Sequence, residues 1–333
     1  MAKKIAIDLG TANSLVLIKG KGIVLSEPTV VAVSLDDRKV LAIGREAKEM
    51  LGKVPGNIVA RRPLKQGVIA SYKLTEALLK ALVNKALGPS RLFKPEILIS
   101  VPAGLTSVEE RAVIEAATAA GASKVYLIPE PIAAAIGADL PISTSAGNMI
   151  VNMGGGTSEI AVISLNGIVI SQSRRVAGDA INEALVSYIK RKFGMLIGEQ
   201  MAEKIKISIG SAIMTDNPAE MEIRGRDANS SLPAAKVLNS NEIVPPIQMV
   251  LKQIIVGIRE VLEATPPELA SDIIDRGMVL SGGTAALNNI DDLFTAETGV
   301  PAHVVDEPIL AVIKGLGKTL DHLDVLRRSM KVA

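Results

Sequence analysis

The sequence predicts an α/β protein built from two similar lobes, and three observations support this prediction. Its 333 residues exceed the size of one ordinary domain. Apolar stretches with the spacing of strands alternate with stretches of helical spacing in both halves of the chain. A segment near the N-terminus, residues 5–26, recurs with little change as residues 150–171. Together these features indicate a duplicated domain with mixed sheets.

The repeated segment opens each half with a predicted three-stranded meander. Each copy reads as strand, turn, strand, turn and strand, and its first turn consists of small residues. The aligned pairs are Asp8 with Asn152, Gly10 with Gly154, and Ser14 with Ser158. The copies lie too far apart in the chain for a solenoid repeat, so duplication of a whole domain explains them better.

Further strands and helices are predicted after each meander. Ser107 followed by Glu110 is a capping-box arrangement, so we expect a helix from Ser107 to about Gly121. The other predicted strands are residues 96–101, 125–128 and 277–281, and the other predicted helices are residues 132–136, 180–193, 199–209 and 242–265. This alternation is typical of the α/β class.

The composition excludes several classes of function. Only 2% of the residues are aromatic and Trp is absent, so the cores must be aliphatic and base-stacking platforms are not expected. The 37 basic and 35 acidic residues give a net charge of +2 without a basic block, so no nucleic-acid partner is expected. Because Cys is absent and His303 and His322 are the only histidines, disulfides, zinc–thiolate sites and a Ser-His-Asp triad are excluded.

No segment has the pattern of a membrane span or of a signal peptide. Every apolar run is interrupted by charge or Gly well before the roughly 20 residues that cross a bilayer. The few residues before the first predicted strand leave no room for the apolar stretch of a signal peptide. We therefore expect a cytoplasmic protein whose membrane contact, if it has any, is peripheral.

Three turns of small residues follow predicted strands, at residues 10–13, 154–157 and 282–284. Such residues let backbone N–H groups approach an anion closely, so the three turns together could clamp a polyphosphate. Taken singly, each turn is better explained as an ordinary tight turn, but the symmetric pair favours phosphate binding. Other phosphate motifs are missing, because Val312 occupies the position where a Walker A loop ending at Lys318 would need Gly.

These turns resemble the phosphate-1, phosphate-2 and adenosine motifs of the actin, heat-shock chaperone and sugar kinase superfamily. Within it, the chain resembles the MreB family of bacterial actins, which determine rod shape, over essentially its whole length. The segments that carry this resemblance are residues 22–28, 55–59, 62–65, 130–137, 162–165, 222–227 and 265–269. The chain is also too short to hold the substrate-binding domain of a chaperone.

The resemblance implies an actin-like duplicated fold with two lobes and four subdomains around a nucleotide cleft. The mixed sheets, of the five-stranded type, would be flanked by helices. The first lobe would comprise residues 1–147 and 315–333, with a subdomain inserted at about 32–77. The second lobe would comprise residues 148–314, with an insertion at about 179–250.

The resemblance also implies a site for ATP or ADP with Mg²⁺. Asp8 would hold Mg²⁺ through water, while the two phosphate turns would grip the phosphates from opposite lobes. The family's nucleotide-binding positions correspond here to Asp8, Gly10, Thr11, Ala12, Asn13, Gly154, Gly155, Gly156, Thr157, Gly178, Asp179, Glu203, Lys206, Gly282, Gly283 and Thr284. Glu203 and Lys206 would contact the ribose and adenine, although without the resemblance their spacing is better explained by an exposed salt bridge.

Catalysis would depend on Glu130, Thr157 and Asn152. Glu130 matches the family residue that positions or activates the attacking water, although by itself it reads as a loop carboxylate between two prolines. The family has Asp where this chain has Asn152, and the missing charge predicts retained ATP binding with slow or absent hydrolysis. A degenerate site that binds no nucleotide is a further alternative.

The resemblance implies self-association, a membrane surface and membrane-protein partners. The chain would form a homopolymer of antiparallel double filaments that pair through the helix carrying Val108, a residue that would otherwise be placed in the core. Leu92 and Phe93 lie beside cations and would either dip into the inner membrane surface or pack into the lobe. Membrane proteins of cell-wall elongation, including a bitopic regulator, would bind the filament.

The favoured function is therefore an ATP-controlled cytoskeletal filament that organises lateral cell-wall synthesis and so determines cell shape. Two alternatives remain open. One is a small-metabolite kinase on the same scaffold, for which the sequence offers no obvious acidic base in a sugar pocket. The other is a scaffold that binds ATP without hydrolysing it, which Asn152 favours.

Overall fold

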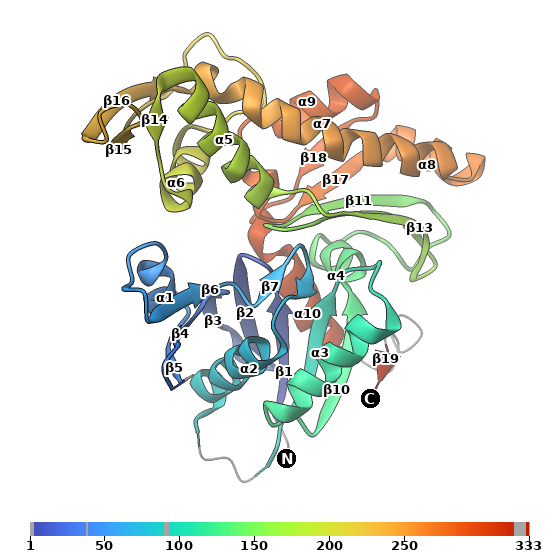
Figure 1. Ribbon diagram of the computed structural model, residues 1–333. Helices are drawn as coiled ribbons and strands as arrows, with labels where there is room; N and C mark the ends of the chain where they lie inside the picture. The colour runs from blue at the N-terminus through green and yellow to red at the C-terminus, as the bar shows by residue number, and fades with distance from the viewer. Residues whose placement is uncertain (1–2, 38, 90–92, 323–330, 333) are drawn as a thin grey trace.

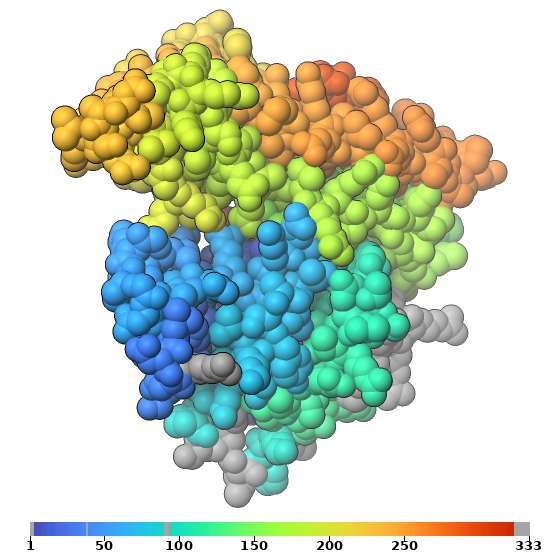
Figure 2. Space-filling view, viewed as in Figure 1, coloured from blue at the N-terminus to red at the C-terminus, as the bar shows by residue number. Residues whose placement is uncertain are grey.

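Two lobes face each other in the computed structural model, which describes residues 3–37, 39–89, 93–322 and 331–332 (Figure 1). The lower lobe in this view holds most of the N-terminal half, and the upper lobe holds the segment coloured from green to orange. Figure 2 shows that the space-filled surfaces of the lobes are separated by a hollow along part of their boundary. Each lobe is organised around one large mixed sheet.

The sheet of the first lobe has the strand order β19-β10-β9-β1-β2-β3. Strands β1, β2 and β3 form an antiparallel meander, and β9 and β10 continue the sheet in parallel from β1. The bounds are β1 Lys4–Leu9, β2 Asn13–Ile18, β3 Gly22–Pro28, β9 Glu96–Val101, β10 Lys124–Pro129 and β19 Lys331–Val332. This sheet has six strands rather than five because the short β19 pairs with β10.

The sheet of the second lobe repeats this arrangement in the order β13-β12-β11-β17-β18. Its antiparallel meander is again continued in parallel by two later strands. The bounds are β11 Asn148–Met153, β12 Ser158–Ser164, β13 Gly167–Arg174, β17 Met278–Ser281 and β18 Ala302–Val304. The duplication predicted from the sequence is therefore visible as two sheets with the same topology at their centres.

Helices cover both faces of the two large sheets, and smaller sheets extend each lobe. The helices are α1 Arg45–Met50, α2 Tyr72–Leu87, α3 Ser107–Ala119, α4 Glu130–Gly137, α5 Gly178–Phe193, α6 Glu199–Ile209, α7 Ser240–Ala264, α8 Pro267–Arg276, α9 Ile290–Thr298 and α10 Ala311–Asp321, with 3₁₀ turns η1 Gly283–Ala286 and η2 Pro308–Leu310. The remaining strands are β4 Val31–Ser34, β5 Val40–Ile43, β6 Ile58–Arg61, β7 Leu64–Lys65, β8 Val68–Ile69, β14 Met195–Leu196, β15 Glu220–Asp227 and β16 Pro233–Asn239. No helix in the described part of the chain is long and apolar enough to cross a membrane.

The α/β class with mixed sheets flanked by helices is confirmed, and α6 has the predicted bounds. The predicted capping box is wrong by one residue. Thr106, not Ser107, is the N-cap of α3, and its partner at the third helical position is Glu109 rather than Glu110. Thr106 Oγ1 accepts a hydrogen bond from Glu109 N at 3.3 Å, and the Glu109 carboxylate accepts one from Thr106 N at 2.8 Å. Adjacent Thr-Ser and Glu-Glu pairs make both registers possible in the sequence.

An aliphatic core joins the two lobes. Helices α4 and α10 contact each other, with α10 against β1 and β2 and α4 against β11 and β12. Buried side chains from both sheets therefore meet on this helix pair, among them Ala6 and Leu15 from the first sheet and Ile150 and Ile163 from the second. Separate aliphatic clusters lie on the outer face of each sheet.

Two glycines set the distance between α4 and α10. A Cβ atom added to Gly137 would lie 1.8 Å from the carbonyl oxygen of Ala311, and one added to Gly315 would lie 1.8 Å from that of Ala133. Real Cβ contacts are never this short, so any side chain here forces the helices apart. The packing of the two lobes thus depends on both positions remaining Gly.

We predict that Gly137→Ala or Gly315→Ala lowers the free energy of unfolding by about 2 kcal/mol or more, because overpacking outweighs the helix propensity gained by Ala. Urea denaturation of the purified variants measures the loss. Gly56→Ala is the matched control, since a Cβ at Gly56 meets no atom within 4 Å. Stability equal to that of Gly56→Ala would contradict the prediction.

Candidate functional site

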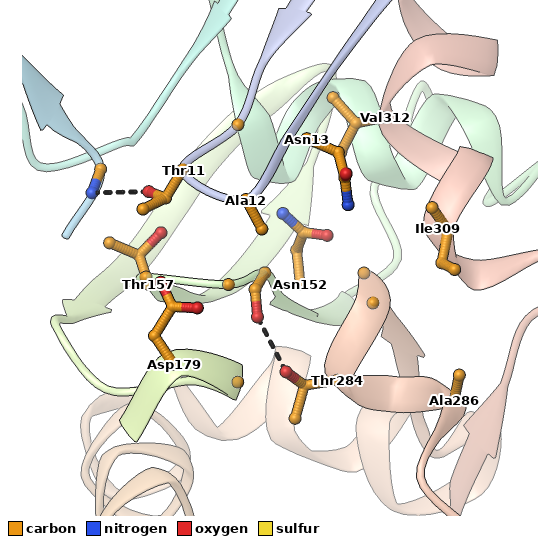
Figure 3. A pocket seen from close by; sticks show the side chains of 18 of the residues that line it. Thr11, Ala12, Asn13, Asn152, Thr157, Asp179, Thr284, Ala286, Ile309 and Val312 are labelled. Carbon is orange, nitrogen blue, oxygen red and sulfur yellow. Dashed lines mark hydrogen bonds between the residues drawn. The ribbon is translucent and has the colours of Figure 1, made fainter. Parts of the chain in front are cut away.

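A cavity of about 330 Å³ lies between the lobes, at the ends of β1 and β11. Every residue predicted for nucleotide binding or catalysis lines it, although these residues come from segments far apart in the chain. They are Asp8, Gly10, Thr11, Ala12, Asn13, Glu130, Asn152, Gly154, Gly155, Gly156, Thr157, Gly178, Asp179, Glu203, Lys206, Gly282, Gly283 and Thr284. Figure 3 shows that several of them point into one common space.

The turn after β1 and the turn after β11 face each other across this cavity (Figure 3). A Cβ atom on Gly155 would lie 2.7 Å from Cβ of Ala12, and one on Gly156 would lie 2.7 Å from Oγ1 of Thr11. Glycine is therefore required for the two backbones to approach so closely. The second turn is closed by a hydrogen bond from Gly154 N to the Thr157 carbonyl oxygen at 2.8 Å. Backbone N–H groups of two lobes can thus converge on one anion.

The third turn and the start of α5 complete the wall of the cavity. Thr284 Oγ1 donates a hydrogen bond to the carbonyl oxygen of Gly154 at 2.8 Å, as the dashed line in Figure 3 marks. Lys206 Nζ donates to the carbonyl oxygen of Gly178 at 2.8 Å. Asp179 N donates to the carbonyl oxygen of Gly155 at 2.8 Å, which holds the N-terminus of α5 against the second turn. The positive end of the helix dipole is thereby directed toward the place where an anion would bind.

Glu203 and Lys206 do not form the exposed salt bridge that their spacing alone suggests. Glu203 Oε2 lies 2.7 Å from Nζ of Lys48, which belongs to the first lobe. Burial lowers the pKa of Lys206, and Asp179 and Glu203 partly oppose that shift. The two side chains share one wall of the cavity but have different partners.

Ion pairs connect the lobes at the mouth of the cavity. Arg62 of the first lobe contacts Asp179 and Glu199 of the second, with N–O distances of 2.9 Å in both cases. Gln200 Nε2 donates a hydrogen bond to the Lys48 carbonyl oxygen at 2.8 Å. The sequence analysis did not assign these contacts, because only the tertiary structure brings residues so distant in the chain together.

Asp8 lies on the floor of the cavity and is buried. Its Oδ1 accepts a hydrogen bond from Ser100 Oγ at 3.0 Å. Burial raises the pKa of Asp8 from 3.8 to about 6, and the Ser100 hydrogen bond opposes this shift. The described residues contain no group of three or more acidic or histidine side chains that could hold a metal ion. A metal at Asp8 would therefore need oxygen ligands from water and from a bound phosphate.

Glu130 is held by Asn152. The side-chain amide of Asn152 donates to Oε2 of Glu130 at 3.3 Å, and Ser281 Oγ donates to the amide oxygen of Asn152 at 3.1 Å. Burial raises the pKa of Glu130 well above its ordinary value, and the charges of Glu159 and Asp8 raise it further. Glu130 is the first residue of α4 rather than part of a loop, so the loop interpretation is wrong.

The apolar wall of the cavity could not be predicted from sequence patterns. It consists of aliphatic side chains from α6, from the segment at η1, from η2 and from the start of α10. These residues are Ile207, Ala286, Leu287, Ile309 and Val312. Single aliphatic residues of this kind carry no sequence signal that separates them from ordinary core positions. Together they provide an apolar surface against which a flat ring could pack.

Two predicted surface sites lie away from the cavity. Val108 on α3 is 76% exposed, so its placement in the core is wrong. Phe93 is 59% exposed rather than packed into the lobe, and Leu92 lies outside the described residues.

We predict that Asp8→Asn stabilises the nucleotide-free protein above pH 6 by up to about 3 kcal/mol. The folded state keeps a proton on Asp8 that the unfolded state has lost, so stability falls as pH rises from about 4 to about 6. Urea denaturation at pH 4 and pH 7.5 tests this, with the exposed Asp216→Asn as control. If Asp8→Asn is the less stable protein at pH 7.5, the prediction is wrong.

Comparisons with known proteins agree with this geometry. The family model described as MreB/Mbl protein matches residues 2–328. The cell shape-determining protein MreB of Escherichia coli K12 is 49% identical over 330 residues, which cover 96% of this chain and 94% of that protein. The cell shape-determining protein Mbl of Bacillus subtilis 168 is 48% identical over 325 residues, which cover 98% of each chain.

Solved structures show the same fold. Spiroplasma citri MreB5 bound to ADP has a TM-score of 0.92 and 33% identity, and the match covers 98% of each chain. A chain of the MamK double helical filament has a TM-score of 0.80 at 20% identity, covering 96% of this chain and 99% of that one. This chain therefore has an actin-like fold and belongs to the MreB/Mbl family.

Proposed function

We propose that this chain binds ATP with Mg²⁺ in the cavity between its lobes and forms filaments that determine cell shape. The observation that carries the proposal is the meeting of two glycine turns, one from each lobe, at a single cavity. The similar MreB5 of Spiroplasma citri was solved with ADP and with AMPPNP. Relatives with 48–49% identity are described as cell shape-determining proteins.

The cavity has a polar end and an apolar end, which suits the two ends of a nucleotide. The phosphates would lie between the turns at residues 10–13 and 154–157, where backbone N–H groups of both lobes converge. The adenosine would lie against residues 282–284, with Ile207 and Ile309 beside the base. Glu203 and Asp179 would face the ribose hydroxyls.

Asp8 is the residue that would hold Mg²⁺ through water. Ser100 engages its Oδ1, and Asp8 is the carboxylate on the floor beside the first phosphate turn. A divalent cation would offset the burial that raises the pKa of Asp8 and would favour its charged form. The ion would neutralise charge on the β- and γ-phosphates.

Glu130 would serve as the proton acceptor in ATP hydrolysis. The oxygen of a water molecule forms a bond to the γ-phosphorus, while the bond from that phosphorus to the bridging oxygen of ADP breaks. Glu130 takes the proton of the water, and ADP and phosphate are the products. Thr157 would orient the water or the γ-phosphate from the second turn. Burial raises the pKa of Glu130, which makes its carboxylate a stronger base than an exposed one.

Asn152 favours slow hydrolysis with retained binding. Its amide accepts a hydrogen bond from Ser281 and donates one to Glu130. Because the amide carries no negative charge, it cannot orient metal-bound water as a carboxylate would. A scaffold that uses ATP only as a bound ligand is therefore the second candidate function.

We predict that Asn152→Asp increases phosphate release at least tenfold, whereas Glu130→Gln reduces it at least tenfold below wild type. Both variants should bind fluorescent ATP within a few-fold of the wild-type affinity. Phosphate release and ATP binding are measured side by side with Mg²⁺ and with EDTA. A wild-type rate that equals that of Asn152→Asp contradicts the proposed role of Asn152, and absence of ATP binding contradicts the proposed function.

The division into subdomains is also a proposal. Residues 1–147 and 315–333 would form the first lobe and residues 148–314 the second, with inserted subdomains near 32–77 and 179–250. The small sheets β4-β5-β6 and β14-β15-β16 support the two insertions. Arg62 would then connect the insertions across the cleft mouth.

Filament and membrane contacts are supported by exposed apolar side chains. Val108 would pair protofilaments in antiparallel double filaments. Phe93, beside the exposed Lys94, would insert into the inner membrane surface. Membrane proteins of cell-wall elongation, including a bitopic regulator, would then organise wall synthesis along the filament.

We predict that Val108→Glu leaves folding and ATP binding unchanged but converts double filaments into single ones. The side chain is too exposed for the substitution to change stability by more than about 0.5 kcal/mol. Electron microscopy of filaments assembled with ATP is the measurement. Leu165→Glu is the control, because Leu165 lies in a hairpin turn and its exposure is similar to that of Val108. Double filaments that persist with Val108→Glu would rule out this pairing surface.

A further inference from the structure

A row of polar side chains crosses the apolar face of the second sheet. Ser281, Asn152, Glu159 and Ser173 are successive cross-strand partners on β17, β11, β12 and β13. Residues two positions away on the same face are aliphatic, such as Ile150 and Ala161, and belong to the core between the lobes. Buried polar side chains destabilise the fold unless they form hydrogen bonds. The hydrogen-bond partners of this row therefore indicate its role.

Glu159 is the charged member of this row and is fully buried. Its Oε1 accepts a hydrogen bond from Ser173 Oγ at 2.6 Å, and its Oε2 accepts one from the backbone N of Ala103 at 3.1 Å. Ala103 belongs to the first lobe, in the loop between β9 and α3. No lysine or arginine among the described residues forms an ion pair with Glu159. A buried carboxylate without a cation is expensive to retain, which indicates a role beyond packing.

Glu159 is connected to the proposed proton acceptor, Glu130, through Asn152. Its cross-strand partner Asn152 donates to Glu130 at 3.3 Å, and cross-strand neighbours have Cβ atoms about 5 Å apart. Glu159 does not line the cavity, so it cannot touch a nucleotide. The groups that face Glu130 are Asp8 from β1, Asn152 from β11 and Glu159 from β12. After burial, the charge of Glu159 is the largest cause of the raised pKa of Glu130.

We propose that Glu159 is a positioning residue for ATP hydrolysis, whose buried charge keeps Glu130 a strong proton acceptor while its bond to Ala103 fixes the facing loop of the first lobe. This inference rests on the proposed function. In this proposal, Ser173 Oγ and Ala103 N stabilise the Glu159 carboxylate, which does not line the cavity. Burial raises the pKa of Glu159, and the hydrogen bonds from Ser173 Oγ and Ala103 N oppose that shift because they stabilise the carboxylate.

Two substitutions separate the charge from the anchoring bond. Glu159→Gln removes the charge and keeps the size of the side chain, and it should fold because it eliminates an unpaired buried charge. Glu159→Asp keeps the charge but is one methylene too short to reach Ala103 and Ser173 together. Glu222→Gln, which neutralises an exposed glutamate on β15, is the matched control.

The first measurement is the pH dependence of phosphate release at saturating Mg-ATP. With Glu159→Gln, we expect the acidic limb of kcat to move at least one pH unit lower and kcat to fall about three- to tenfold, while KM for ATP changes less than twofold. Glu159→Asp should keep the acidic limb of the wild type but unfold at a lower temperature. Glu222→Gln should match the wild type in every respect.

The second measurement needs no hydrolysis. ¹³C NMR of nucleotide-free protein labelled at the glutamate carboxyl carbon follows the titration of Glu130, whose signal is assigned by its loss in Glu130→Gln. We expect the Glu130 midpoint to fall by at least one pH unit in Glu159→Gln and to stay in place in Glu159→Asp. An unchanged midpoint in Glu159→Gln overturns the proposal and leaves Glu159 with a purely structural role. If wild-type protein releases no phosphate but the midpoint moves, hydrolysis fails as a function while the link from Glu159 to Glu130 stands.

Discussion

The contact between α4 and α10 is the constraint on which the rest of the structure depends. Both helices lie in the aliphatic core between the two sheets, and Gly137 and Gly315 let them touch along their backbones. The distance between the sheets therefore depends on the absence of a side chain at both glycines. Because β1 and β11 belong to different sheets and each ends at a turn that lines the cavity, the same distance determines how closely these two turns approach.

In the site, buried carboxylates lie inside the cavity and ion pairs between the lobes lie at its mouth. Its floor carries Asp8 and Glu130, with Glu159 behind them, and burial raises the pKa of all three. Arg62 and Lys48 pair with carboxylates of the opposite lobe at the mouth, and Lys206 lies on one wall of the cavity. Carboxylates gathered in this way repel one another, and a divalent cation held at Asp8 would offset that repulsion.

Asn152 belongs to this balance. Its amide donates to Glu130 and receives a hydrogen bond from Ser281, so one neutral side chain connects the second sheet to the first helix of the joining core. A carboxylate in its place would add a further negative charge to a floor that already holds several. The neutral side chain therefore limits the number of charges that this part of the cavity has to hold.

Local sequence patterns were sufficient to predict the duplication, the α/β class and the residues of the two facing turns, because small residues after strands and a repeated meander are short-range features. It also identified the residues that line the polar part of the cavity, through resemblance to a family whose motifs are short and contiguous. It could not place the capping box of α3 in the correct register, because Thr106-Ser107 and Glu109-Glu110 offer two equivalent choices.

The side-chain contacts between the lobes could not be predicted in this way. These contacts join segments that are distant in the chain. Glu203 pairs with Lys48 and not with Lys206, Arg62 pairs with carboxylates of the second lobe, and Ala103 N donates a hydrogen bond to Glu159. Exposure of Val108 and burial of Glu159 were likewise decided by packing. The physical reason is that partner choice and burial depend on distances that the folded core sets, and no local pattern in the sequence encodes those distances.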